Sequence, residues 1–110
     1  MRTASVQVNN ILQSVERRDL VNNVQRVFLS LVNADGDGWV PRTALRVKSA
    51  SARIRDLRKD EFGGFRVECA SANDLNKSGR SKVTTRQTFY RIVPRSVTVS
   101  RVGKVLKGVI

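Results

Sequence analysis

The chain has 110 residues, 40% of them apolar, and its 21 lysines and arginines against nine acids give a net charge of +12. This length suits one modest domain, and the absence of histidine and the single cysteine, Cys69, exclude His-dependent catalysis, His-containing metal sites, an internal disulfide and a thiolate zinc cage. No apolar run approaches the roughly 18 residues of a membrane helix and no signal-peptide h-region is visible, so we expect a soluble cytoplasmic protein, without cofactor, small-molecule substrate or enzymatic activity.

The first two predicted elements are amphipathic helices. The first has Val8, Ile11, Leu12 and Val15 at helical spacing, which leaves an apolar stripe over 6–15. The second carries its apolar face on Leu20, Val24, Val27, Phe28 and Leu31, with Asp19 as the expected N-cap. Turn chemistry over 33–38 ends it.

The middle of the chain predicts a short strand and two short helices. Trp39-Val40 is extended because it precedes Pro41, and Pro41 suits the first turn of a helix over about 41–47. Lys48-Ser49 forms a tight turn, and Ser49 or Ser51 caps a helix over about 50–60. Ala50, Ile54 and Leu57 share one apolar face of this last helix.

The rest of the chain predicts a β-hairpin and a tail. Phe65, Val67 and Cys69 alternate with polar residues, so Cys69 is expected to be an inert core residue. Residues 70–86 are expected to form a long basic loop, and 88–93 the returning strand. The tail, 95–110, fits a basic amphipathic helix, a strand pairing in a dimer or a segment trailing along DNA.

The charge rises toward the C-terminus. Residues 1–40 hold four cations and four acids, residues 41–76 eight and five, and residues 77–110 nine cations and no acid. A positive field of this size attracts polyanions, so nucleic acid is the leading class of partner.

Four short motifs in this order resemble the small winged helix-turn-helix DNA-binding proteins of bacteria and their phages. They are the strand and first helix Trp39-Val40-Pro41-Arg42-Thr43-Ala44-Leu45, the recognition-type helix Ala52-Arg53-Ile54-Arg55-Asp56-Leu57-Arg58, and the strands Gly64-Phe65-Arg66-Val67-Glu68 and Tyr90-Arg91-Ile92. The resemblance implies an α+β winged helix-turn-helix fold over 19–94, flanked by an N-terminal helix in 1–18 and the tail. Its expected core is Leu20, Val24, Phe28, Leu45, Ile54, Leu57, Val67 and Ile92.

The predicted function is sequence-specific binding of duplex DNA by a small transcriptional or recombination regulator. Helix 50–60 would enter the major groove, with Arg55 as the bidentate partner of a guanine and Ser51 near a phosphate. The wing over 70–86 would follow the backbone or the minor groove. The predicted DNA-binding residues are Arg42, Ser49, Ser51, Arg53, Arg55, Arg58, Lys59, Lys77, Arg80, Lys82 and Arg86.

Other interpretations remain open at this point. Asn33, Asp35 and Asp37 resemble the start of an EF-hand loop, but position 12 is Ala44 rather than a bidentate carboxylate, so we expect a polar turn and no metal. An RNA-binding or ribosome-associated protein would need exposed stacking aromatics or recognition of the shape of A-form RNA, and a protein-binding adaptor would use the 6–15 stripe. A homodimer is expected, through that stripe or the valine-rich tail.

Overall fold

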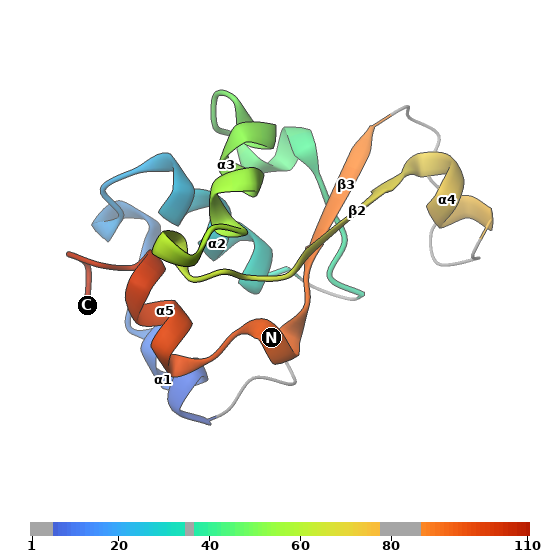
Figure 1. Ribbon diagram of the computed structural model, residues 1–110. Coiled ribbons are helices and arrows are strands. Elements are labelled where there is room, and N and C mark those ends of the chain that lie inside the picture. The colour runs from blue at the N-terminus through green and yellow to red at the C-terminus, as the bar shows by residue number, and fades with distance from the viewer. Residues whose placement is uncertain (1–5, 35–36, 78–86) are drawn as a thin grey trace.

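A computed structural model describes residues 6–34, 37–77 and 87–110, in which short helices surround a small antiparallel sheet (Figure 1). The helices are α1 (Val6–Gln13), α2 (Asn23–Val32), α3 (Ala50–Leu57), α4 (Ala72–Lys77) and α5 (Val99–Val105), and the strands are β1 (Val40–Pro41), β2 (Val67–Ser71) and β3 (Thr88–Ile92). Short 3₁₀ helices lie at Arg17–Asp19, Arg42–Leu45, Asp60–Phe62 and Pro94–Ser96. The predicted α+β class is confirmed.

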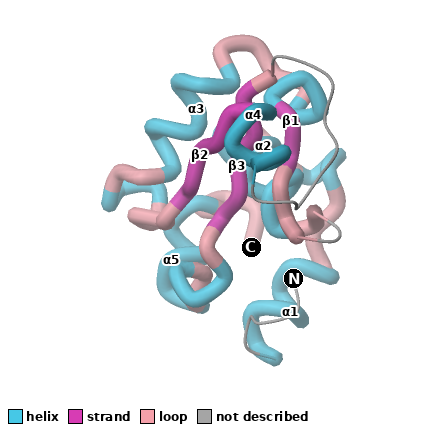
Figure 2. The backbone as a smooth tube through the Cα atoms, turned by 90° about the vertical axis from the view of Figure 1, so that its right-hand side faces the viewer, coloured by secondary structure: helices cyan, strands magenta, loops and turns pink. Residues whose placement is uncertain are grey.

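The strands of the described chain form one sheet in the order β1-β3-β2, with antiparallel neighbours. Val67 of β2 pairs with Ile92 of β3, and Val40 of β1 pairs with Tyr90. Figure 2 shows the strands side by side, with α3 on the β2 side and α5 below. The hairpin strands predicted around 65–69 and 88–93 are therefore confirmed.

Helix α2 supplies much of the core. Val27 and Phe28 are fully buried, and the Phe28 and Phe65 ring centroids lie 4.9 Å apart. All eight residues expected in the core are at most 6% exposed: Leu20, Val24, Phe28, Leu45, Ile54, Leu57, Val67 and Ile92. The apolar periodicity thus identified the buried faces correctly.

The start of α2 differs from the prediction. Its N-cap is Asn22, whose Oδ1 accepts a hydrogen bond from the Gln25 N–H at 2.9 Å. Asp19 instead ends the preceding 3₁₀ helix, where its carboxylate accepts from the Glu16 N–H at 3.0 Å. Leu20 is buried although it lies before the helix. Including it in the helical periodicity therefore placed the predicted N-cap three residues too early.

Both terminal segments pack into the same hydrophobic core as the middle of the chain. Val8, Leu12 and Val15 are at most 8% exposed, and α1 packs against α5 (Figure 1). The tail forms α5, as one of its three expected conformations, and its buried Val102, Val105 and Leu106 join that core. Most of the 6–15 stripe is therefore covered by the tail within the chain, whereas Val6 at the start of α1 is 73% exposed.

A buried glutamine fixes the end of the tail. Gln25 is 1% exposed; its Oε1 accepts from the Val21 N–H at 2.8 Å, and its Nε2 donates to the Lys107 carbonyl at 3.3 Å. A buried amide needs such partners, because an unpaired polar group in the interior costs about 1–3 kcal/mol. Gln25 thereby joins the start of α2 to the end of α5.

Residues 70–86 are not the uninterrupted loop that their polarity suggests. Strand β2 continues to Ser71, and α4 follows it. The Ser71 hydroxyl accepts from the Asp74 N–H and the Asp74 carboxylate accepts from the Ser71 N–H, both at 3.2 Å, which is a capping box. Leu75 packs with Phe89 in a second small cluster at this end of the sheet.

Cys69 is exposed, which corrects its expected place in the core. In β2 only Val67 is buried, because the β2–β3 ribbon extends beyond the helices that cover its first residues (Figure 1). The alternation of apolar and polar residues correctly indicated a strand, but the hydrophobic core ends before the strand reaches Cys69.

Candidate nucleic-acid interface

Helix α3 is held by one face and leaves the other to solvent. Ala50, Ile54 and Leu57 are at most 6% exposed and pack toward α2, as predicted. Ser51, Arg55 and Lys59 are exposed. The α-helix ends at Leu57, three residues before its predicted end, and a 3₁₀ helix follows at Asp60–Phe62. This arrangement provides a rigid helix with a polar outer face.

The turn before α3 has an unusual backbone. Arg46 and Ser49 both lie in the left-handed region, each with φ of 55°. Such positions cost free energy in residues other than glycine and occur often at functional sites. Ser49 makes no side-chain cap, and the Ser51 hydroxyl lies 3.3 Å from the Tyr90 hydroxyl. Ser49 therefore occupies the N-cap position as expected but without a capping hydrogen bond from its side chain, and Ser51 contacts the sheet.

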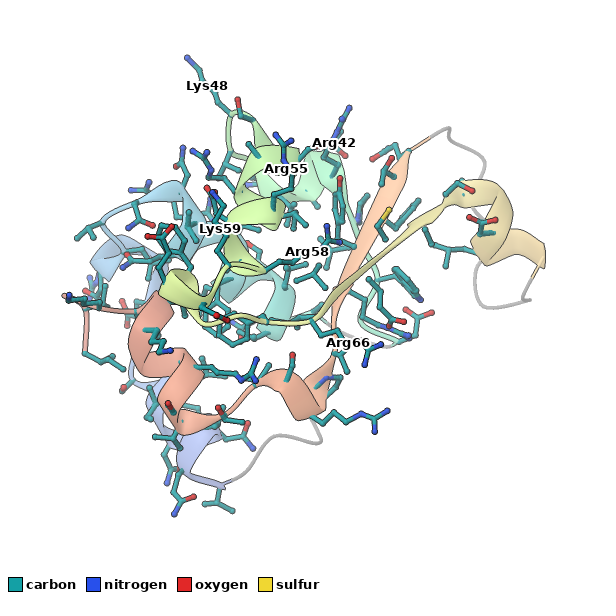
Figure 3. The ribbon with its side chains drawn as sticks, in the orientation of Figure 1. Arg42, Lys48, Arg55, Arg58, Lys59 and Arg66 are labelled. Carbon is teal, nitrogen blue, oxygen red and sulfur yellow. The ribbon has the colours of Figure 1, made fainter. Side chains whose placement is uncertain are left out.

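An open groove of about 690 Å³ lies between the 3₁₀ helix Arg42–Leu45, this turn and the start of α3. Its charged lining residues are all cations, and Figure 3 shows three of them, Arg42, Lys48 and Arg55, on the same end of the molecule. The full lining is Arg42, Thr43, Arg46, Val47, Lys48, Ser49, Ala50, Ser51, Ala52 and Arg55. We call this the basic groove.

The cations of the basic groove differ from the remaining cations in and just after α3, because their side chains have no partner in the described ranges. Within the described ranges, no hydrogen bond or ion pair engages the side chains of Arg42, Arg46, Lys48 and Arg55, and all four residues are exposed. Unpaired cations around one concave surface produce a local positive potential that attracts an anion. The sequence reasoning included Arg42 and Ser49 but missed Arg46 and Lys48, the two cations of the turn itself.

Three predicted contacts, Arg53 on α3 and Arg58 and Lys59 just beyond its end, are engaged within the protein. Arg53 Nε lies 2.9 Å and Lys59 Nζ 3.2 Å from the two carboxylate oxygens of Asp56. Arg58 Nη2 donates to the Val67 carbonyl at 2.7 Å. Among the four predicted cations over 53–59, Arg55 is therefore the one without a partner in the described part of the chain.

Arg58 closes the outer edge of the sheet. The Val93 N–H donates to the Arg66 carbonyl, so the next residue of β2, Val67, turns its carbonyl away from β3. Arg58 caps that carbonyl, and the Asp74 carboxylate accepts from the Ser71 N–H at the other end of the edge. Capped edges resist pairing with other strands.

We therefore expect Arg58→Met to act on stability. The methionine keeps an apolar stem but removes a charge-assisted hydrogen bond, at a cost of about 1–2 kcal/mol in the free energy of unfolding. Urea denaturation followed by circular dichroism measures it. The matched control is Arg66→Met, because Arg66 is exposed and its side chain has no partner among the described residues. Equal destabilisation by both substitutions would contradict the edge role.

The predicted wing lies largely beyond the described ranges. Arg80, Lys82 and Arg86 fall there, and the backbone of Lys77 ends α4. Where the description resumes, Gln87 Oε1 accepts a hydrogen bond from Thr43 Oγ1 at 2.8 Å. Thr43 lines the basic groove, so the start of β3 lies beside it.

Other sites are limited in the described ranges. No group of three or more Cys, Asp and Glu side chains there is arranged to hold a metal ion, and no helix there has the length and apolarity to cross a membrane. Asp35 of the calcium-like motif falls outside those ranges. Comparisons with protein-family models, curated proteins and solved structures find no match to this chain.

Proposed function

We propose that the chain binds duplex DNA, as a transcriptional or recombination regulator of winged helix-turn-helix type. The observation that carries the proposal is the basic groove, in which four exposed cations lie beside the outer face of α3 with no acid and no side-chain partner among the residues that the structure describes. Backbone phosphates match such a surface, because the phosphate charge dominates affinity for DNA.

The order of the elements supports the fold part of the proposal. Helix α2, strand β1, a helical turn, α3 and the β2–β3 hairpin follow one another, and β3 lies between the other strands. In a helix-turn-helix, the second helix lies in the major groove and the turn lies near the backbone. On that model α3 reads bases through Arg55, and Arg42, Arg46 and Lys48 bind phosphates.

Two alternatives receive less support. Recognition of single-stranded RNA uses exposed aromatic faces, but Phe28, Phe65, Phe89 and Tyr90 are at most 8% exposed, and the Arg91 guanidinium covers the Trp39 ring at 4.6 Å. A protein adaptor working through the 6–15 stripe is disfavoured, since Val8, Leu12 and Val15 of that stripe are at most 8% exposed. A homodimer remains part of the proposal, and Val6, Val99 and Ile110 are the large apolar residues still exposed on the two segments named for its interface.

Salt dependence tests the proposed function. If the chain neutralises roughly six phosphates, the logarithm of its affinity for a random-sequence duplex falls against the logarithm of salt with a slope of about −5, from about −0.9 per contact. Fluorescence anisotropy at several salt concentrations measures the slope, with a folded RNA hairpin of equal length as competitor. A slope near zero, or preference for the hairpin, would contradict duplex binding.

A further inference from the structure

One carboxylate on α3 is shared between two cations. Asp56 Oδ2 lies 2.9 Å from Arg53 Nε, and Asp56 Oδ1 lies 3.2 Å from Lys59 Nζ. The Asp56 side chain is 16% exposed, against 34% for Arg53 and 58% for Lys59. Each oxygen thus has its own cation, at positions three residues before and after it, where side chains on a helix meet.

The cluster occupies one flank of the outer face of α3. Successive residues of a helix turn by about 100°, which puts Arg55 and Asp56 on different sides of the outer face of α3. Lys59 lies just beyond the end of the helix and extends back to Asp56. Ser51 and Arg58, on the side of Arg55, contact the sheet through Tyr90 and Val67. Arg55 is therefore a free cation on the side toward the sheet, and the side away from it carries a cluster in which Asp56 offsets one of two positive charges.

This arrangement affects random and preferred DNA differently. Binding to random sequence rests on phosphate contacts, so it depends on how many cations are free to make them. A carboxylate that holds two cations along the helix reduces that number and itself repels phosphates. Contacts with bases by Arg55 do not use those cations. Specificity is a difference of affinities, so weaker binding to random DNA raises it.

We propose that Asp56 is a specificity-determining positioning residue, which holds Arg53 and Lys59 away from the DNA backbone and thereby suppresses binding to random sequence. This inference rests on the proposed function, because it assumes that the outer face of α3 meets duplex DNA. Asp56 acts through its two partners and makes no base contact of its own.

The central test is Asp56→Asn, which keeps the shape of the side chain and releases both cations. The probes are a random-sequence duplex and a duplex selected with the unmodified protein from a random pool. We expect affinity for the random duplex to rise about three- to tenfold and its salt slope to steepen by about 1–2, since each freed cation adds about 0.9. The ratio of selected to random affinity should fall.

The matched control is Asp60→Asn, which removes the same charge from an exposed carboxylate that has no ion pair among the described residues. It should change affinity for the random duplex less than twofold and leave the slope unchanged. Asp56→Glu, which can still reach both cations, should restore the original ratio. Equal effects of Asp56→Asn and Asp60→Asn would overturn the proposal, as would weaker random binding by Asp56→Asn.

If circular dichroism shows that Asp56→Asn does not fold, a second variant tests the same inference. In Arg53→Gln with Lys59→Gln, Asp56 has no cations to hold, and we expect less than a threefold loss of random-duplex affinity because those cations contribute little while held. A loss above tenfold would mean that they contact DNA despite Asp56, which overturns the inference. If the unmodified protein shows no salt-dependent duplex binding, the proposed function itself fails. That result is distinct from failure of the inference on Asp56, which is judged only by how the variants differ from an unmodified protein that binds.

Discussion

Replacing Arg42, Arg46, Lys48 and Arg55 together by glutamine is expected to weaken binding to a random-sequence duplex about a hundredfold and to reduce the salt slope by about 3–4, at about 0.9 per phosphate contact. The four side chains line one groove, are exposed and have no partner in the described part of the chain. Their removal leaves no acid unpaired there, so the fold should persist.

The control for this variant has the same net charge. Arg66, Arg95, Lys104 and Lys107 are also exposed, and none of them lines the basic groove. Changing these four to glutamine should lower affinity less than tenfold, because charges beyond about 10 Å are screened at 0.1 M salt. Anisotropy titrations of both variants at matched salt make the comparison. Equal losses would mean that net charge alone drives binding and that the groove has no special role.

Most of the described core could be predicted from the spacing of apolar residues, but the points at which the core ends could not. The apolar faces of α2 and α3 follow directly from spacing, since a helix places residues three and four apart on one side. Cys69 shows the limit, because alternation identifies a strand but not where its neighbours stop covering it. Helix α4 had a readable signal in the capping box of Ser71 and Asp74, which the polar composition obscured.

The candidate site was half predictable for a similar reason. Sequence marks which cations lie on the outer face of α3, but only geometry shows that Arg58 is bonded to the sheet and that Asp56 holds its two neighbours. Arg46 and Lys48 enter the site through the left-handed backbone of the turn, at Arg46 and Ser49. No spacing rule indicates such a conformation in residues other than glycine.

The second large effect that we expect is a loss of stability when the buried contacts of the terminal segments are removed. Leu106 is fully buried and belongs to the core that α5 shares with α1 and α2. Leu106→Ala should therefore lower the free energy of unfolding by about 2–5 kcal/mol, the cost of a cavity left by a buried leucine. The control is Ile110→Ala, whose side chain is 55% exposed and whose loss should cost less than about 0.5 kcal/mol.

The same reasoning predicts that a fragment of residues 19–94 does not fold. It lacks Val8, Leu12, Val102, Val105 and Leu106, all at most 7% exposed, and it leaves Gln25 without the Lys107 carbonyl. Several losses of about 1–3 kcal/mol each exceed what a small domain tolerates, since its whole stability is about 5–15 kcal/mol. Circular dichroism and urea denaturation of the fragment, beside the full chain, decide the matter. A cooperative unfolding transition in the fragment would mean that the two terminal segments are additions to an independently folding domain. The buried contacts between α5 and α1 would then stabilise only those two helices.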